Sequence, residues 1–211
     1  MEDLKHKITV GAFELFMKYG IRSVTMDDIA RHLGISKKTI YQGFSDKDEV
    51  VLAVTRTHQC DMEIQVKSIA EASSSAIEEL LRFSVVFRNQ MKQMNPSLMF
   101  DLFKYHRVAW EEWLAYKANV IKKCVSDTIK RGMSEGFFRA DINADILATF
   151  RMEQIEMAFN DSIYPHNQYN FEEVQLQLFE HFIYGCLTQK GMALYEENKK
   201  KLFETETILN K

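Results

Sequence analysis

Apolar residues recur every three or four positions along the first fifty residues, which is the spacing of an amphipathic helix. One apolar stripe occupies residues 4–19 and stops at Gly20, and a second occupies residues 26–33 and stops at Gly34. A third, shorter stripe lies within residues 37–44. Glycine often ends a helix because it adopts positive φ at little cost. The pattern therefore predicts three helices near the amino terminus.

Polar residues at the predicted helix starts support these boundaries. Thr25 and Asp28 have the spacing of a capping box, and Ser36 is a suitable N-cap for the third helix. We expect Ser45, with Asp48 three residues later, to begin a fourth helix. Only a short turn separates the second helix from the third, so the sequence predicts a helix-turn-helix.

The third helix presents a polar face to its surroundings. At about 100° per residue, a helix that buries Ile40 points Lys38 and Gln42 outward. Thr39 and Tyr41 flank these two residues, and no acidic residue interrupts the face. Lysine donates to guanine O6 and N7, and glutamine pairs with adenine. Lys38 and Gln42 are therefore candidates for base contacts in the major groove.

Phosphate contacts are expected around these base contacts. Thr39, Tyr41 and Lys47 can reach phosphates, and so can backbone N–H groups at the helix starts. An isolated pair such as Lys37 and Lys38 would fit a solvated helix face better than a binding site. Because the acid-free face, the caps and the turn occur together, we favour DNA binding.

Residues 12–54 resemble the DNA-binding region of the TetR family of bacterial transcriptional regulators. The likeness lies in "LF..YG", in "T..DIA..LG.S..T.Y..F" and in the lysine that follows shortly after. The resemblance implies DNA contacts by Thr25, Lys37, Thr39, Tyr41 and Lys47.

The same resemblance implies a fold and a mode of action. It predicts an all-α homodimer with an amino-terminal three-helix helix-turn-helix DNA-binding domain and a carboxy-terminal helical bundle for ligand binding and dimerisation. We place these domains at residues 1–46 and 47–211. In this family a small effector typically binds the second domain and releases the protein from its DNA operator. Two recognition helices about one helical turn (~34 Å) apart would specify a palindromic site.

Gly43 departs from the family pattern, in which histidine or an aromatic residue often occupies this position. Glycine costs roughly 1 kcal/mol in a helix interior and offers no side chain to a phosphate. We therefore leave Gly43 out of the site and expect the end of the third helix to be less firmly anchored.

Composition narrows the class of protein. The chain has 211 residues, of which 46% are hydrophobic and 27% charged, with only 8 Gly and 2 Pro, which fits a helical globular protein. The net charge of −3 means that DNA binding must depend on where the charges lie. The apolar runs are too short for a membrane span, and the charged amino terminus lacks a secretory signal. Three widely spaced cysteines suit a reducing compartment, so we expect a cytoplasmic protein without a membrane partner.

Two later segments, 144–160 and 171–187, are apolar on more than one face. Such a helix must bury both sides, one against its own domain and the other against a second chain. We predict a four-helix homodimer interface that includes Phe150, Ile155, Phe159, Phe179, Phe182 and Ile183. The alternative is that both helices are central in a monomer.

An effector pocket is indicated only by aromatic and methionine residues, which line adaptable apolar sites but also fill ordinary cores. The candidates for this pocket are Phe87, Met91, Phe103, Trp110 and Trp113. The chemical identity of the effector is left open.

No catalytic motif is present: the sequence lacks a glycine-rich phosphate loop, an HExxH motif and a CxxC motif. His58 and Cys60 are two residues apart, which on a helix gives poor geometry for a metal. We therefore expect no catalytic site, no metal and no cofactor. The function expected is a repressor released from its operator by a small molecule. The alternatives are an activator of the same fold, or a helical enzyme or binding protein whose first helices are only structural.

Overall fold

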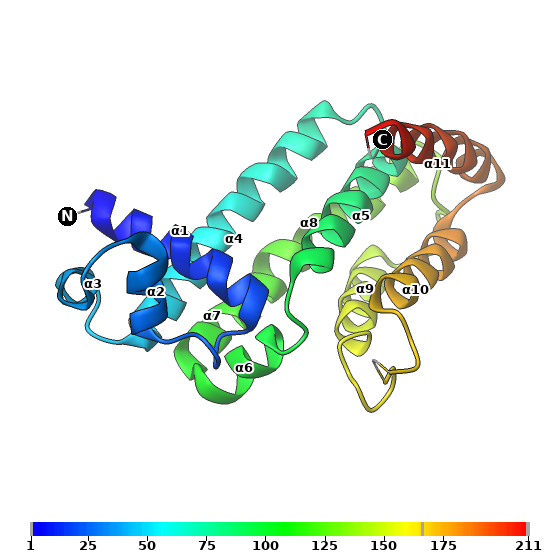
Figure 1. Cartoon of the computed structure of the whole chain (residues 1–211). Coiled ribbons are helices and arrows are strands. Elements are labelled where there is room, and N and C mark those ends of the chain that lie inside the picture. Colours follow the sequence, from blue (N-terminus) through cyan, green and yellow to red (C-terminus); the bar gives the residue numbers. More distant parts are fainter. Residues whose placement is uncertain (1, 166, 210–211) are drawn as a thin grey trace. The chain divides into compact units, whose positions relative to one another are not determined.

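The protein is described by a computed structural model, which describes residues 2–165 and 167–209, with side chains through residue 201. These residues form helices joined by short loops (Figure 1). Their one β-type contact is an isolated antiparallel bridge between Phe138 and Leu187. The prediction of an all-α fold is confirmed.

The chain divides into two packed units. The amino-terminal unit comprises Met1–Gln65 and Gln93–Lys117, and the carboxy-terminal unit comprises Val66–Lys92 and Ala118–Lys211. These units are defined by packing, whereas the domains 1–46 and 47–211 were predicted from function. The domain boundary at residue 46 stays a prediction.

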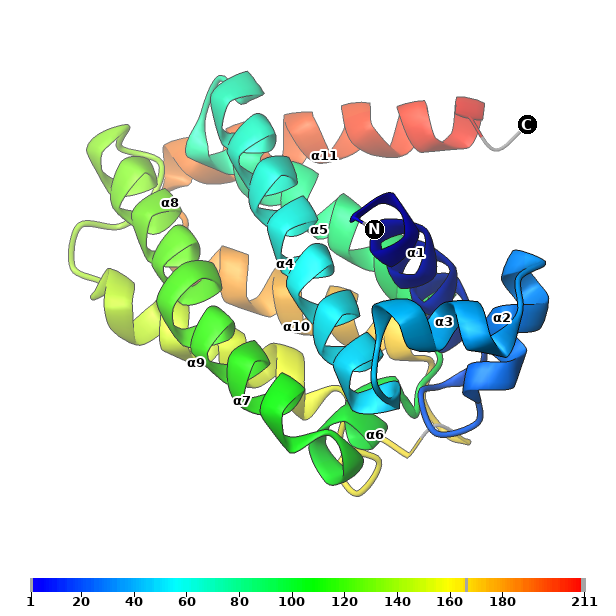
Figure 2. The same cartoon turned by 90° about the vertical axis from the view of Figure 1, so that its left-hand side faces the viewer.

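The amino-terminal unit holds the predicted helix-turn-helix. Its helices are α1 (Glu2–Tyr19), α2 (Met26–Leu33), α3 (Lys37–Gly43), the first part of α4 (Lys47–Ala72), α6 (Leu98–Tyr105) and α7 (Arg107–Tyr116). In both views α2 and α3 lie next to α1 (Figures 1 and 2), and the three helices contact one another. Ile8, Ile29, Ile40 and Val50 have no exposed surface, so one core unites the first four helices.

The helix ends follow the predicted chemistry with one exception. Thr25 and Asp28 form a complete capping box, and Gly34 ends α2 with φ of 64°. The prediction that Ser45 caps the fourth helix is wrong, because the Asp46 carboxylate accepts the N–H of Glu49 at 2.9 Å. Ser45 donates its own N–H and hydroxyl to the Glu49 carboxylate, so it lies one position before the cap.

The carboxy-terminal unit is a bundle with a separate core. Its helices are the end of α4, α5 (Ala76–Gln93), α8 (Lys122–Ser134), α9 (Ala144–Met157), α10 (Phe171–Cys186) and α11 (Gln189–Leu209). A π-helical turn, Lys117–Ile121, joins α7 to α8, so the long helix predicted up to Gly136 is continuous but contains this irregularity. Ile77, Ile129 and Ile183 have no exposed surface in this core.

A buried carboxylate fastens α5 to α8. Glu79 is 4% exposed, and its carboxylate accepts the Thr128 hydroxyl at 2.7 Å and pairs with Arg131 at 3.0 Å. Arg131 also donates to the carbonyl of Ser73 and pairs with Glu135. A buried ion pair of this kind is tolerated because hydrogen bonds satisfy its remaining groups.

We predict opposite effects of alanine at two helical glycines. A Cβ on Gly132 would lie 2.3 Å from the ring of Phe138, which is 1% exposed and has no room to move. Gly132→Ala should lower the free energy of unfolding by about 1–3 kcal/mol, the usual cost of overpacking. A Cβ on Gly43 would meet only ordinary contacts at 3.5 Å or more. Gly43→Ala should raise the free energy of unfolding by up to about 1 kcal/mol through helix propensity.

Urea unfolding of both variants, followed by circular dichroism, checks these signs. Equal unfolding midpoints for Gly132→Ala and the unmodified protein would contradict tight packing of Phe138 on α8.

Candidate nucleic-acid interface

Helix α3 is positioned by its buried side and by its caps. Ile40 has no exposed surface, and the Ser36 hydroxyl accepts the N–H of Thr39 at 3.1 Å. Phe44, directly after the helix, is 5% exposed, and the Lys5 ammonium lies 5.5 Å from its ring centroid. Gly43 is buried beside α1, so the end of α3 is packed by the backbone rather than by a side chain.

The predicted base-contacting residues lie on the exposed side of α3. Lys38 and Gln42 are exposed, Tyr41 is 47% exposed, and Thr39 is partly buried with its hydroxyl 2.8 Å from that of Ser36. In the described part of the chain, no side chain forms an ion pair with Lys38. This arrangement leaves lysine and amide donors available to base edges, and their contact with DNA stays a prediction.

Lys37 is held by an acid on the neighbouring helix. Its ammonium donates to Asp27 at 2.7 Å, and both side chains are about half exposed. The hydrogen bond to Asp27 raises the pKa of Lys37, so this residue stays charged. A phosphate contact by Lys37 would compete with the Asp27 carboxylate.

Lys47 is tied to the loop before α2. Its ammonium donates to the carbonyl of Ile21 at 2.6 Å, and partial burial lowers the pKa of Lys47. The predicted phosphate contact of Lys47 would require this bond to be exchanged. In the structure described, Lys47 instead connects the start of α4 to the α1–α2 turn.

Thr25 uses its hydroxyl in the capping box. The hydroxyl donates to Asp28 at 2.6 Å and accepts the N–H of Asp28 at 3.2 Å. These hydrogen bonds to Thr25 lower the pKa of the Asp28 carboxyl. Thr25 is exposed at the start of α2, where backbone N–H groups and the helix dipole favour an anion such as a phosphate.

Helices α6 and α7 are bonded directly to the helices around the interface. Asp101 on α6 accepts the N–H of Arg22 at 2.9 Å, in the turn before α2. His106, 8% exposed, lies 2.6 Å from Asp48 on α4 through its Nδ1. The sequence analysis did not assign Asp101 and His106 to this site. Their partners are 58 and 79 residues away in sequence, so no local pattern could have revealed the bonds.

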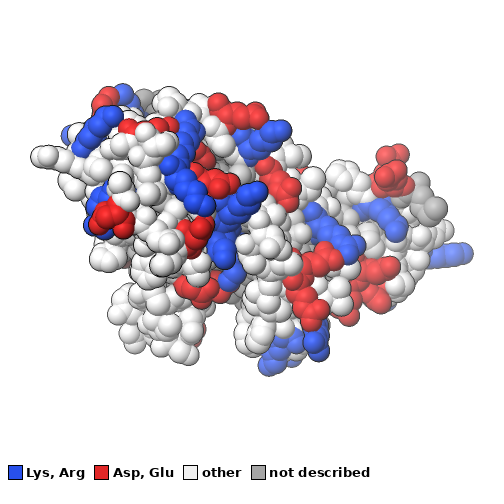
Figure 3. Space-filling model, turned by 180° about the vertical axis from the view of Figure 1, so that it is seen from behind, with Lys and Arg blue, Asp and Glu red and all other residues white. Residues whose placement is uncertain are grey.

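Charge on the surface is mixed. In the face shown in Figure 3, lysine and arginine lie among aspartate and glutamate, without one continuous basic area. The net charge of −3 agrees with this distribution. Binding to DNA must therefore depend on the local arrangement of donors on α3 rather than on bulk attraction.

The residues predicted for an effector pocket belong to different units. Phe87 lines a cavity of the carboxy-terminal unit, and Met91 is half-buried on the same helix. Trp110 and Trp113 pack against the core of the amino-terminal unit. Phe103, also in that unit, is 58% exposed with its ring 5.5 Å from that of Trp110. The assignment of these five residues to an effector stays a prediction.

The residues predicted for a dimer interface also differ in placement. Three are buried in the core of their own unit: Phe179, Phe182 and Ile183. Ile155 and Phe159 are half-buried, while Phe150 is 48% exposed. Ile146, four residues before Phe150 on α9, is 65% exposed and was not singled out from the sequence. The apolar surface that α9 leaves open is therefore carried by Ile146 and Phe150.

Other kinds of site were examined over the same described residues. No cluster of three or more histidine, cysteine, aspartate or glutamate side chains there is arranged to hold a metal ion. No helix in that part of the chain has the length and apolar character to cross a membrane. Burial raises the pKa of the Cys124 and Cys186 thiols to about 11, while Cys60 is exposed.

Known proteins resemble this chain in sequence and in fold. The family model for bacterial regulatory proteins of the tetR family matches residues 8–54. The uncharacterized HTH-type transcriptional regulator YvaF of Bacillus subtilis is 30% identical over 141 residues, which cover 63% of this chain and 73% of that protein. The HTH-type transcriptional repressor KstR2 of Mycobacterium tuberculosis is 22% identical over 142 residues, covering 66% and 71%. A transcriptional regulator of Saccharomonospora viridis, solved in complex with choline, superposes with a TM-score of 0.74 at 18% identity, covering 90% of this chain and 100% of that one.

A helix-turn-helix with an exposed polar third helix, followed by a helical domain, defines a DNA-binding transcriptional regulator. The chain belongs to the TetR family of bacterial regulatory proteins. The predictions of the family, of the fold class and of a regulatory DNA-binding function are thereby confirmed. The relatives it matches are transcriptional regulators, not enzymes.

The pair between Lys37 and Asp27 generates a prediction about DNA affinity. Asp27→Asn should tighten binding to any duplex several-fold at low salt, because it frees Lys37 and removes a negative charge beside the phosphates. Asp61→Asn is the matched control, since Asp61 is an exposed acid of the same unit on α4. Fluorescence anisotropy of labelled duplex measures both. An equal gain for the two variants would mean that only net charge had changed.

Proposed function

We propose that the protein is a repressor that binds a palindromic operator as a homodimer and dissociates when a small molecule occupies its carboxy-terminal domain. One observation carries this proposal: α3 buries Ile40 completely while Lys38 and Gln42 remain exposed on the opposite side. A helix held in this way can enter the major groove without disturbing the core beneath it.

Repression is favoured over activation by the relatives. KstR2 is named a repressor, and its match extends over 66% of this chain, well beyond the helix-turn-helix. The alternative is an activator of the same fold. In a strain that lacks the protein, transcripts of its target genes rise if it represses and fall if it activates.

Release by an effector is supported by the bonds that join α6 and α7 to the helices near the DNA. Asp101 holds the turn before α2, and His106 holds the start of α4. A ligand that displaces α6 or α7 would move these attachments together. Such a ligand must bind the DNA-free conformation more tightly, because equal affinity for both conformations shifts nothing. The regulator from S. viridis was solved with choline, which shows that protein holding a small molecule.

A helical enzyme or binding protein with purely structural first helices is the alternative from another class. Saturable, salt-dependent binding to a specific duplex would exclude it. Specific protein–DNA complexes have dissociation constants of roughly 10⁻⁸–10⁻¹¹ M at physiological salt.

The proposal predicts a loss of specificity when the outward side chains of α3 are removed. Lys38→Ala/Gln42→Ala should weaken binding to the operator at least about tenfold, because each base contact contributes roughly 1–3 kcal/mol. Binding to random duplex should fall far less. Anisotropy titrations at two salt concentrations, with duplex from upstream of the protein's own gene, measure both affinities.

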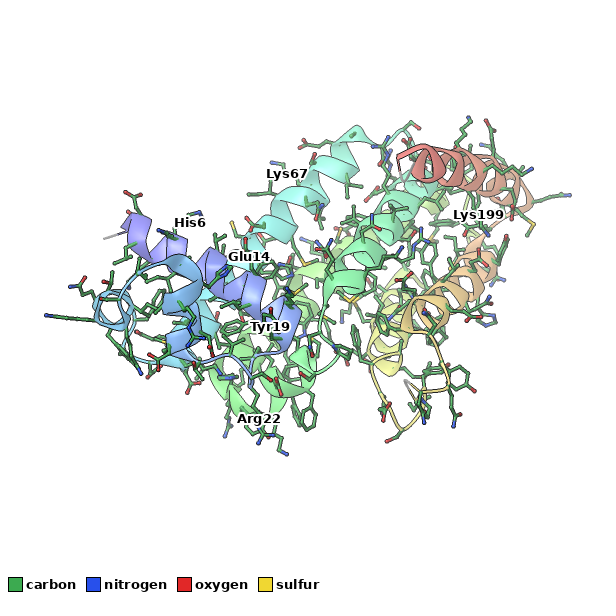
Figure 4. All side chains as sticks on the ribbon, in the orientation of Figure 1. His6, Glu14, Tyr19, Arg22, Lys67 and Lys199 are labelled. Carbon is green, nitrogen blue, oxygen red and sulfur yellow. The ribbon has the colours of Figure 1, made fainter. Side chains whose placement is uncertain are left out.

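Gln65→Ala/Lys67→Ala removes the same two residue types from α4 and serves as the control (Lys67 is labelled in Figure 4). Lys67 is 78% exposed, so its loss should leave operator binding unchanged. An equal loss of affinity for operator and random duplex in Lys38→Ala/Gln42→Ala would refute base contacts by α3.

Dimerisation gives a separate prediction. Phe150→Glu places a charge on the exposed apolar surface of α9 and should raise the dimer dissociation constant at least about tenfold. Phe100→Glu is the matched control, because Phe100 is a similarly exposed phenylalanine of α6. Analytical ultracentrifugation measures both variants. A stable dimer of Phe150→Glu would place the interface elsewhere.

A further inference from the structure

A cavity of the carboxy-terminal unit lies among α5, α9 and α10. Its volume is about 230 Å³, part of which is open to solvent. Helix α5 contributes Ser84, Phe87 and Arg88, and α9 contributes Arg151. This volume is below the range of roughly 300–1,000 Å³ that drug-sized ligands occupy, so a small ligand is indicated.

Arg151 is the unusual member of this lining. The residue is 8% exposed, and its Nη1 is buried without a hydrogen-bond partner. Within the described residues, no acid forms an ion pair with it. Buried arginines are normally paired, because an isolated charge in a low-dielectric interior is costly. The burial lowers the pKa of Arg151 to about 10, which still leaves the guanidinium charged at neutral pH.

The contacts that Arg151 does make leave its charge uncompensated. Its guanidinium lies 5.3 Å from the ring centroid of Phe179 and 6.0 Å from that of Phe182. Cation–π contacts of this kind are attractive, but they supply no acceptor for the N–H groups. The guanidinium therefore has an unused donor beside a cavity.

Gln175 contributes an unused acceptor to the same cavity. Its Nε2 donates to the carbonyl of Ile155 at 3.0 Å, which fixes the amide orientation. Its Oε1 is buried and has no partner. A ligand that satisfies both groups needs an acceptor for Arg151 and a hydrogen-bond donor for Gln175.

Charge and apolar surface narrow the ligand further. The lining contains two arginines, Arg88 and Arg151, and no acid, so its potential favours an anion. Phe87, Leu176 and Phe179 supply apolar surface for the rest of the molecule. The planar guanidinium fork matches a carboxylate. A fully ionised phosphate would bring no proton for Gln175.

We propose that this cavity binds a small organic carboxylate that carries an apolar body and a hydroxyl or N–H donor. Its carboxylate pairs with Arg151, its donor group bonds to Oε1 of Gln175, and its apolar body packs against Phe87 and Phe179. This inference rests on the proposed effector-dependent function, for which it supplies the chemical class of the effector.

The test uses the full chain and hydroxybenzoates as probes. Isothermal titration with 3- and 4-hydroxybenzoate is compared with their primary amides, with phenol and with inorganic phosphate. We expect at least one hydroxybenzoate to bind at least tenfold more tightly than its amide, phenol or phosphate. Absence of binding by both carboxylates, or equal binding of the amides or of phosphate, would overturn the proposal.

Variants of Arg151 identify the site. Arg151→Met should fold with an unchanged or higher Tm, because it removes a buried charge that lacks a partner, and should bind the carboxylate at least tenfold more weakly. Arg139→Met is the control: Arg139 is an arginine of the same unit that is 48% exposed and paired with Asp141. Unchanged affinity in Arg151→Met would overturn the assignment. Arg151→Lys keeps the charge and should bind with intermediate affinity, which keeps the test valid if the methionine variant does not fold.

A parallel titration of the protein–operator complex separates this inference from the proposed function. Carboxylate binding that releases DNA supports both. Carboxylate binding that is lost in Arg151→Met but leaves DNA bound supports the ligand class and contradicts effector-dependent release.

Discussion

Helix α3 has seven residues, and an isolated helix of that length is not stable in water. It is held by the complete burial of Ile40, by the Ser36 cap and by the packing of Gly43 and Phe44 beneath it. Because these residues take up the inner side of the helix, Lys38 and Gln42 are free to face outward. DNA binding therefore depends on how α3 is anchored to the small core of α1, α2 and α4.

The same unit includes two helices that are distant in sequence. Asp101 and His106 bring α6 and α7 to the turn before α2 and to the start of α4. Several basic residues near the interface are also engaged within the chain: Lys37 by Asp27 and Lys47 by a carbonyl. Contact with DNA would exchange these bonds for bonds to phosphates, which fits a protein whose net charge is −3 and whose binding is meant to be reversible.

The carboxy-terminal unit contains two buried charges with different surroundings. Glu79 is surrounded by donors from Thr128 and Arg131, so its role is to fasten helices together. Arg151 has aromatic neighbours but no acid, and it lies at a cavity together with an unpaired amide oxygen of Gln175. The contrast is physical: one charge is satisfied by the fold, and the other would be satisfied by a ligand.

The sequence by itself determined the local features: the helix periodicity, the capping box of Thr25, the glycine that ends α2 and the outward face of α3. These depend on residues within four positions of one another, so a pattern can reveal them. Only the tertiary structure decided that Phe179, Phe182 and Ile183 belong to the chain's own core, that Asp101 holds the turn before α2, and that Arg151 lacks an acidic partner. Each of these depends on contacts between segments far apart in the chain, and helical periodicity indicates which side of a helix is buried but not what covers it.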